Sequence, residues 1–292
     1  MDKNNSRREF LQKSAIVGAG LSLIDPLSLQ ALAKKSKMKI GLVTYQWGKD
    51  WDLPTLIANC EKTGFLGVEL RTQHAHGVET TLTSSQRADV KKRFDDSPVT
   101  CVGYGSNFDY HHVDQDRVKQ NIQGTKEYLK LCKDIGATGI KVKPNGIPKE
   151  VPKEKTIAQI ASSFNEVGKY ASDLGQVIRV EVHGKESQKI PNMKAIFEQV
   201  TEKSVKICWN CNNQDLLEPG LEPNFHSVKK WFGDTVHIRE LNVGEYPYQQ
   251  LMNLFLDIKY DGWILLEART SPTDRIAAMN EQMQVFNKMT GN

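Results

Sequence analysis

The chain has 292 residues, of which 39% are apolar and 25% are charged, and its formal net charge at pH 7 is +4. This composition is typical of a globular protein with a substantial core, and the sequence has no run of eighteen apolar residues that would indicate a membrane span. Binding to nucleic acid phosphates needs a clustered basic face, so the small net charge argues against a nucleic acid partner.

The first segment has the pattern of an export signal. Residues 6–13 read Ser-Arg-Arg-Glu-Phe-Leu-Gln-Lys and resemble the twin-arginine motif; an apolar run, Ala15–Ile24, and a small-residue site, Ala31–Ala33, follow. Cleavage after Ala33 would leave a chain close to the roughly 250 residues of a single (β/α)8 barrel. We therefore expect residues 1–33 to be a signal and the mature protein to be periplasmic or exported. An amphipathic N-terminal helix with two chance arginines is the alternative.

From Met38 onward, short apolar or β-branched runs alternate with helical patterns, and no Pro/Gly/Ser-rich linker divides them. The runs are Ile40–Tyr45, Gly67–Arg71, Val99–Tyr104, Gly139–Lys143, Val177–His183, Val205–Trp209, Val236–Leu241 and Trp263–Ala268. The helical stretches are Leu53–Thr63, Ser84–Phe94, Gln115–Ile135, Ile157–Leu174, Asn192–Val200, Phe225–Phe232, Tyr248–Ile258 and Asp274–Met289. This alternation predicts a single (β/α)8 TIM barrel over residues 38–292. The alternative is an open doubly wound sheet, but no strand leads into the G-x-G-x-x-G turn of a dinucleotide site.

Five cysteines are spread along the chain at irregular spacing. An odd, irregular set does not indicate a disulfide framework. Cys208 and Cys211 have the C-x-x-C spacing of redox and zinc sites, but they lie along a predicted strand end rather than at a helix start, where a thiolate would be stabilised. We expect both to be buried structural thiols.

Polar side chains recur at the ends of the predicted strands. A (β/α)8 barrel carries its active site at the C-terminal ends of its strands, and side chains two apart on a strand share a face. These rules select an inward set: Glu69, Arg71, Lys141, Lys143, Glu181, His183, Asn210, His237, Arg239, Glu267 and Arg269. Any one of them could belong to a buried charge pair, but their recurrence on successive strands predicts a site. The carboxylates and imidazoles of this set are ligand types that Mn²⁺, Mg²⁺, Co²⁺ or Zn²⁺ accept.

Three strand-end motifs carry a family resemblance: V-E-V-H-G around Glu181, V-H-I-R-E around His237 and L-L-E-A-R around Glu267, supported by G-F-L-G-V-E-L at Gly64–Leu70. In this order they resemble the xylose-isomerase-like barrel family, which includes sugar phosphate isomerases and epimerases and endonuclease IV-type nucleases. The resemblance runs across the whole chain after the signal. It implies a divalent metal held by residues of strands five to eight, here Glu181, Asn210, His237 and Glu267.

One position departs from the family pattern. Where relatives have Asp on the sixth strand, this chain has Asn210, and replacing a carboxylate with an amide removes a negative charge and weakens a cation site. His183, two residues after Glu181 and on the same face, could compensate as a ligand. Weak or water-mediated binding is the other alternative.

The resemblance also implies proton abstraction next to a carbonyl, through an enediolate, on a small-molecule carbohydrate. In that case Glu181 and Glu267 would bind metal and one of them could move the proton, with His183 as the other candidate base. The residues expected to hold substrate oxygens or offset negative charge are Lys143, Arg239 and Arg269. The aromatic residues that could stack on a sugar ring are Tyr45, Trp47 and Trp209, although barrel-mouth aromatics also serve as lid packing.

Export bears on the substrate, because sugar phosphates are mainly cytosolic. We therefore expect a metal-dependent isomerase or epimerase that acts on a free sugar or keto-sugar. The same proton abstraction would serve elimination from a 3-keto-glycoside, so a lyase or hydrolase is one alternative, and a non-catalytic carbohydrate-binding barrel is another. A metal-dependent nuclease is disfavoured, because it calls for more His and Asp ligands than the strand ends offer. The sequence leaves a homo-oligomer open.

Overall fold

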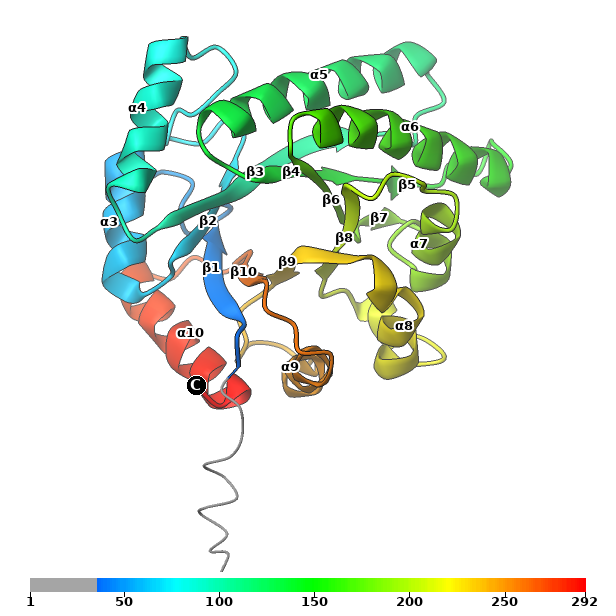
Figure 1. The fold of residues 1–292 in the computed structure, drawn as a ribbon. Coiled ribbons are helices and arrows are strands. Elements are labelled where there is room, and N and C mark those ends of the chain that lie inside the picture. The colour runs from blue at the N-terminus through cyan, green and yellow to red at the C-terminus, as the bar shows by residue number, and fades with distance from the viewer. Residues whose placement is uncertain (1–35) are drawn as a thin grey trace, which may run out of the picture. The chain divides into compact units, whose positions relative to one another are not determined.

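The computed structural model describes residues 36–292, and Lys37–Thr290 form one compact unit. The expected export signal lies outside the described residues. The barrel strands are β1 (Lys39–Val43), β2 (Gly67–Arg71), β3 (Thr100–Asp109), β4 (Gly139–Lys143), β6 (Val177–Glu181), β8 (Val205–Asn210), β9 (Phe232–Ile238) and β10 (Trp263–Leu266). They close into a parallel barrel in the order β1-β10-β9-β8-β6-β4-β3-β2, with helices arranged around it (Figure 1). The prediction of a single (β/α)8 TIM barrel is confirmed.

Eight α-helices alternate with these strands among the described residues. They are α3 (Leu53–Thr63), α4 (Ser84–Asp95), α5 (Gln115–Asp134), α6 (Lys153–Asp173), α7 (Ile190–Phe197), α8 (Leu221–Val228), α9 (Tyr248–Asp257) and α10 (Arg275–Thr290), with two 3₁₀ helices, η1 (Asn213–Leu216) and η2 (Lys229–Trp231). Local sequence sets the ends of α3: the Asp52 carboxylate accepts a hydrogen bond from the Thr55 backbone N–H at 2.9 Å, and Gly64 ends the helix in the left-handed region. The part of the chain that the structure describes contains no helix with the length and apolarity needed to cross a membrane.

Strand pairing explains two of the element boundaries that differ from the prediction. The third strand continues past Tyr104 to Asp109, because Asp109 pairs with Lys143 of β4. The helix expected over Phe225–Phe232 is instead α8, which begins earlier, and Phe232 already belongs to β9, where it pairs with Ile207 of β8. In both places the pairing with a neighbouring strand outweighs the local sequence pattern.

A two-residue ladder lies beyond the ends of β4 and β6. β5 (Asn145–Gly146) pairs in parallel with β7 (Gly184–Lys185). The backbone φ angles of Asn145 and Gly184 are 65° and 98°, and a Cβ on Gly184 would lie 2.3 Å from the carbonyl carbon of Asn145. Position 184 therefore requires glycine. The close approach of Gly184 to Asn145 also holds Asn145 next to His183, the residue before Gly184.

Arg179 fills the barrel interior below the C-terminal strand ends. Its buried guanidinium donates to both carboxylate oxygens of Asp234, at 2.8 and 2.7 Å, and to the Thr138 hydroxyl at 2.7 Å. Glycines at 103 and 139 make room for it, because a Cβ at Gly103 or Gly139 would lie 2.4 or 3.1 Å from Arg179 Nη1. The interior at this level is therefore packed with side chains and is not a pore.

All five cysteines are buried and unpaired. Burial raises the pKa of the Cys60 and Cys132 thiols to about 12, so neither forms a reactive thiolate near neutral pH. The prediction that the chain has no disulfide framework and that Cys208 and Cys211 are buried thiols is confirmed.

Candidate active site

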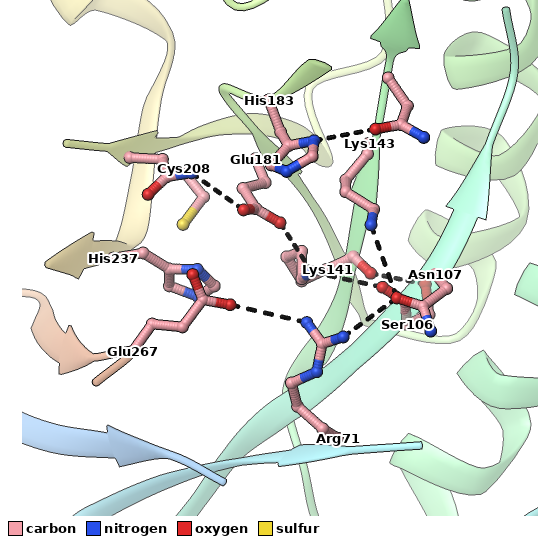
Figure 2. Close-up of polar contacts among 12 residues, drawn as sticks. Arg71, Ser106, Asn107, Lys141, Lys143, Glu181, His183, Cys208, His237 and Glu267 are labelled. Atoms are coloured by element: carbon pink, nitrogen blue, oxygen red, sulfur yellow. Dashed lines mark hydrogen bonds and ion pairs between the residues drawn. The ribbon is translucent and has the colours of Figure 1, made fainter. Parts of the chain in front are cut away.

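Glu181, His237 and Glu267 meet at the C-terminal ends of three barrel strands. Glu181 ends β6, His237 lies near the end of β9, and Glu267 directly follows β10. The three residues are 2%, 0% and 7% exposed, and one carboxylate or imidazole atom from each lies within 4.8 Å of the others. Figure 2 shows the three side chains pointing toward one region. They converge because the strands of a parallel barrel bring their carboxyl ends to the same mouth.

The two carboxylates of this cluster each face a cation from the barrel wall. Lys141 Nζ lies 2.7 Å from Glu181 Oε2, and Arg71 Nη1 lies 3.6 Å from Glu267 Oε1 (Figure 2). Burial opposes ionisation of Glu181, but Lys141 and His237 hold the pKa of its carboxyl well below the usual range. Since Lys141 is wholly buried and an unpaired charge there would be costly, the ion pair fixes the position of Glu181.

A buried carboxylate orients His237. Nε2 of His237 lies 3.3 Å from Glu69 on β2, and both side chains are fully buried. Since a carboxylate only accepts, Nε2 is the donor, and the buried Nδ1 has no hydrogen-bond partner among the described residues. Burial opposes protonation of the ring, but Cys208 and Glu69 raise the pKa of His237 well above its usual value. Nδ1 therefore has no partner in the protein and is free to act as a ligand.

This donor set fits a divalent cation. Two carboxylates and an imidazole nitrogen with no other partner are ligands that such ions accept, and the contact between Glu69 and His237 is the kind that supports metal-binding histidines in general. Asn210, at the end of β8, lies beside the set and donates from Nδ2 to Glu181 Oε1 at 3.0 Å. The residue that replaces the family aspartate thus contacts the cluster through the Glu181 carboxylate.

His183 lies next to the cluster, and the hydrogen bonds around it define its tautomer. The Asn145 amide donates from Nδ2 to the Asp109 carboxylate at 2.6 Å, so its Oδ1 faces His183 Nδ1, 2.8 Å away. Because Oδ1 only accepts, Nδ1 of His183 carries the hydrogen and Nε2 keeps a lone pair. Burial lowers the pKa of His183, which favours the neutral ring. The side chain is therefore arranged to accept a proton through Nε2.

A second group of ligand-type side chains lies at the end of β3. Atoms of Asp109, His111 and His112 lie within 4.8 Å of one another. The Asp109 carboxylate, however, already accepts from Asn121 at 2.9 Å and from Asn145 at 2.6 Å, and His112 Nε2 lies 2.5 Å from it. Because these contacts use the oxygens of Asp109, we assign this group to the support of Asn145.

An inner pocket of about 110 Å³ opens above the cluster. Its lining residues are Tyr45, Arg71, Lys143, Glu181, His183, Glu267 and Arg269. Arg71 and Lys143 both reach Asn107 Oδ1, at 3.0 and 3.5 Å (Figure 2), and burial together with Lys141 lowers the pKa of Lys143. Cationic groups above buried carboxylates can hold substrate oxygens and offset developing negative charge.

A larger outer pocket of about 500 Å³ adjoins the inner one and shares His183 and Arg269 with it. Loops after β6, β8, β9 and β10 line it. The Glu240 carboxylate accepts hydrogen bonds from the backbone N–H groups of Arg269 at 3.0 Å and Thr270 at 2.8 Å. These bonds fix the loop that carries Arg269 between the two pockets.

Residues 57–289 match the family described as the xylose isomerase-like TIM barrel. The chain belongs to this family. The match confirms the resemblance that the strand-end motifs indicate. A comparison with curated protein sequences finds no match.

Solved structures of sugar epimerases have the same architecture. L-ribulose 3-epimerase superposes with a TM-score of 0.73 at 14% identity, covering 87% of this chain and 95% of that chain. For 3-keto-D-glucoside 4-epimerase from E. coli the TM-score is 0.69 at 16% identity, over 86% and 99% of the two chains. For D-psicose 3-epimerase the TM-score is 0.71 at 18% identity, over 87% and 100%. At these identities the likeness shows the shared fold.

The predicted substrate-binding residues of this xylose isomerase-like barrel lie in two different pockets. Tyr45, Lys143 and Arg269 line the inner pocket. Arg239 lines the outer pocket, where its guanidinium donates to the Cys211 carbonyl oxygen.

Two tryptophans expected at the sugar are packing residues instead. Trp47 is 2% exposed, and its Nε1 donates to the Thr270 carbonyl oxygen at 3.1 Å. Trp209 is 0% exposed and packs edge-on against Phe225 and Phe232, with ring centroids 5.7 and 5.8 Å away. The prediction that these two rings stack on a sugar is wrong, because protein atoms cover them and neither lines a pocket described above.

Some residues of the site carry no assigned role in the sequence analysis. Glu69, Arg71 and Lys141 are in the inward set, but their partners depend on pairing across the barrel, which sequence spacing does not show. Asn145 is not predicted as a site residue. A usable signal is the Pro-Asn-Gly sequence directly after β4, since Asn and Gly accept the positive φ of a sharp turn.

Proposed function

We propose that this protein is a carbohydrate isomerase or epimerase that removes the proton next to the carbonyl group of a free sugar or keto-sugar. The observation that carries the proposal is the buried cluster of Glu181, His237 and Glu267, with the lone pair of His183 beside it. The similar structures named above are sugar epimerases, which supports the same chemistry. We also propose, from the N-terminal motif, that the protein is exported by the twin-arginine route.

The three residues of the cluster would hold a divalent cation, with the Asn210 amide beside them. Such a cation polarises a carbonyl oxygen and the neighbouring hydroxyl, so that the hydrogen on the hydroxyl-bearing carbon becomes acidic. The orphaned Nδ1 of His237 is the feature of this chain that favours a cation there. Because Asn210 is neutral, we expect weaker metal affinity than a site with a third carboxylate would have.

The side chains of this protein move the proton and balance the charge. Nε2 of His183, or a carboxylate oxygen of Glu181 or Glu267, accepts the proton, and the C–H electron pair becomes the carbon–carbon double bond of the enediolate. Lys143 and Arg269 lie where they can offset the negative charge on the oxygens. Return of the proton to the opposite face of the same carbon gives an epimer, and return to the neighbouring carbon gives an isomer.

A 3-keto-glycoside lyase is the second candidate, because the outer pocket leaves room for an aglycone beside the inner one. The first step is the same proton abstraction. The electron pair then expels the aglycone oxygen from the adjacent carbon, and the proton goes to the leaving group.

The test measures exchange of substrate hydrogen with deuterated water, and product formation, on a panel of keto-sugars and 3-keto-glycosides with and without added Mn²⁺. Glu181→Gln, His237→Ala and Glu267→Gln are expected to lose bound metal by elemental analysis and to lower turnover about 100-fold or more. Glu61→Gln, on the exposed face of α3, is the control and is expected to retain both. If the three cluster variants keep metal and turnover, the proposal is wrong. Sugar binding without any exchange would identify a non-catalytic binding barrel.

A further inference from the structure

The inner pocket is too small to enclose a whole ligand. Its volume is about 110 Å³, whereas pockets that bury small-molecule ligands have roughly 300–1,000 Å³. The outer pocket has about 500 Å³ and meets the inner one at His183 and Arg269. A substrate whose reacting carbon reaches the carboxylates must therefore extend outward past these two residues.

The charges that line the outer pocket cancel. Arg239 and Arg269 are balanced by Glu240 and Glu245, and no lysine lines this pocket. Arg239 and Glu240 are moreover occupied by backbone groups. A phosphate or carboxylate site needs an excess of cationic donors, so this lining fits an uncharged ligand.

Carboxamides supply the free hydrogen-bonding groups of the outer pocket. Gln188, Asn213 and Gln214 line it, and their side chains make no hydrogen bond with other described residues. A carboxamide both donates and accepts, which matches the hydroxyl groups of a polyol. The half-buried Tyr246 adds aromatic surface against which the apolar C–H groups of a sugar can pack, and the buried Tyr248 ring supports it, with ring centroids 5.0 Å apart.

We propose that the outer pocket is a subsite for a second, uncharged sugar unit, joined to the sugar that reacts at the inner cluster. The substrate class is then a keto-glycoside of at least two units. A free monosaccharide would leave the outer pocket to water, and a sugar phosphate would place its charge in a pocket that has no excess of cationic groups. The inference rests on the proposed function, because it takes the inner cluster as the place of reaction.

Turnover tests the subsite with matched substrates. Wild-type kcat/KM for a 3-keto-disaccharide should exceed that for the corresponding 3-keto-monosaccharide by about tenfold or more, equivalent to about 1.4 kcal/mol. Asn213→Ala should remove donors and Val243→Trp should fill the pocket, and both should abolish this preference by lowering kcat/KM for the disaccharide. Val113→Trp is the matched control, because the two valines are similarly exposed, Val113 at 59% and Val243 at 52%. Val113, however, does not line the outer pocket.

The outcomes separate the inference from the proposed function. Equal turnover of the two substrates, unaffected by Val243→Trp, would overturn the subsite and leave the enzyme activity standing. If neither substrate reacts, calorimetry with the unoxidised disaccharide still decides, because binding that Val243→Trp weakens about tenfold and Val113→Trp does not would support the subsite. No disaccharide binding, or tighter binding of a monosaccharide phosphate, would overturn it.

Discussion

Glu69 and His237 come from strands that are not neighbours in the barrel, and their contact crosses its interior. The carboxylate accepts the Nε2 hydrogen, and Nδ1 has no hydrogen-bond partner among the described residues. Burial raises the pKa of the Glu69 carboxyl, but His237 and Lys141 lower it further, so the group stays ionised. A single charged residue outside the ligand cluster thus determines which nitrogen of His237 is left without a hydrogen bond.

Glu69→Gln keeps the shape of this side chain and removes its charge. We expect Kd for the divalent metal to rise about 10–100-fold, because the imidazole loses the partner that orients it and increases its basicity. Competition with a chromophoric chelator measures this affinity, with Glu61→Gln as the exposed control. An unchanged Kd would show that the Glu69 carboxylate does not support the ligand set.

The alternation of side chains along a strand predicts which residues face inward but not what they meet. Lys141 and Lys143 are equivalent by spacing, since both lie on the same face of β4. In the structure Lys141 is buried against Glu181, and Lys143 lies at the pocket with Asn107. The inward positions of the cluster follow from the sequence. The partners of the two lysines do not, because Glu181 meets Lys141 only when the barrel closes, and Asn107 lies in the part of β3 that extends beyond the predicted strand.

The short ladder of β5 and β7 ties a loop to the candidate base. It places Asn145 against Gly184, one residue after His183, so that the Asn145 amide can reach both the histidine and Asp109. Neither two-residue strand follows from hydrophobic periodicity, because two residues carry no period. Elements of this size are formed by contacts made elsewhere in the fold.

Gly184→Ala tests the ladder. The added Cβ would lie 2.3 Å from the carbonyl carbon of Asn145, so the backbone must move and His183 loses its orienting partner. We expect kcat to fall at least tenfold, or by about 1.4 kcal/mol in activation free energy, with a smaller change in KM. Steady-state kinetics on the most active keto-sugar measures the effect.

Gly175→Ala is the matched control, because Gly175 also has a positive φ, 68°, but a Cβ there meets nothing within 4 Å. It should cost about 1–2 kcal/mol of stability from backbone strain alone and leave kcat unchanged. Equal losses of kcat in the two variants would assign the effect to strain rather than to the ladder.

The described unit, Lys37–Thr290, is a barrel whose five cysteines are all unpaired. This agrees with the export proposal, because the twin-arginine route carries proteins that have already folded and a fold without disulfides does not need an oxidising compartment. The eightfold repeat of strand and helix is visible in the sequence because each unit repeats the same pattern. The ends of individual units are less predictable. Phe232, for example, is predicted as the last residue of a helix but lies in β9, because it pairs with Ile207.

The export proposal predicts the effect of changing both arginines of the signal. Arg7→Lys together with Arg8→Lys should leave uncleaved precursor in the cytoplasm, because the transport route requires the paired guanidinium groups. Cell fractionation followed by immunoblotting measures the distribution, with Lys3→Arg as a control that changes a basic residue outside the motif. Normal export of the double variant would refute the proposal.

Arg179 fills the barrel interior below the carboxylates, so closely packed that a Cβ on Gly103 would lie 2.4 Å from its Nη1. A ligand therefore reaches the carboxylates from the C-terminal end of the barrel, where the two pockets lie. Because the inner pocket has a volume of only about 110 Å³, a product would have to leave it before the next substrate could enter.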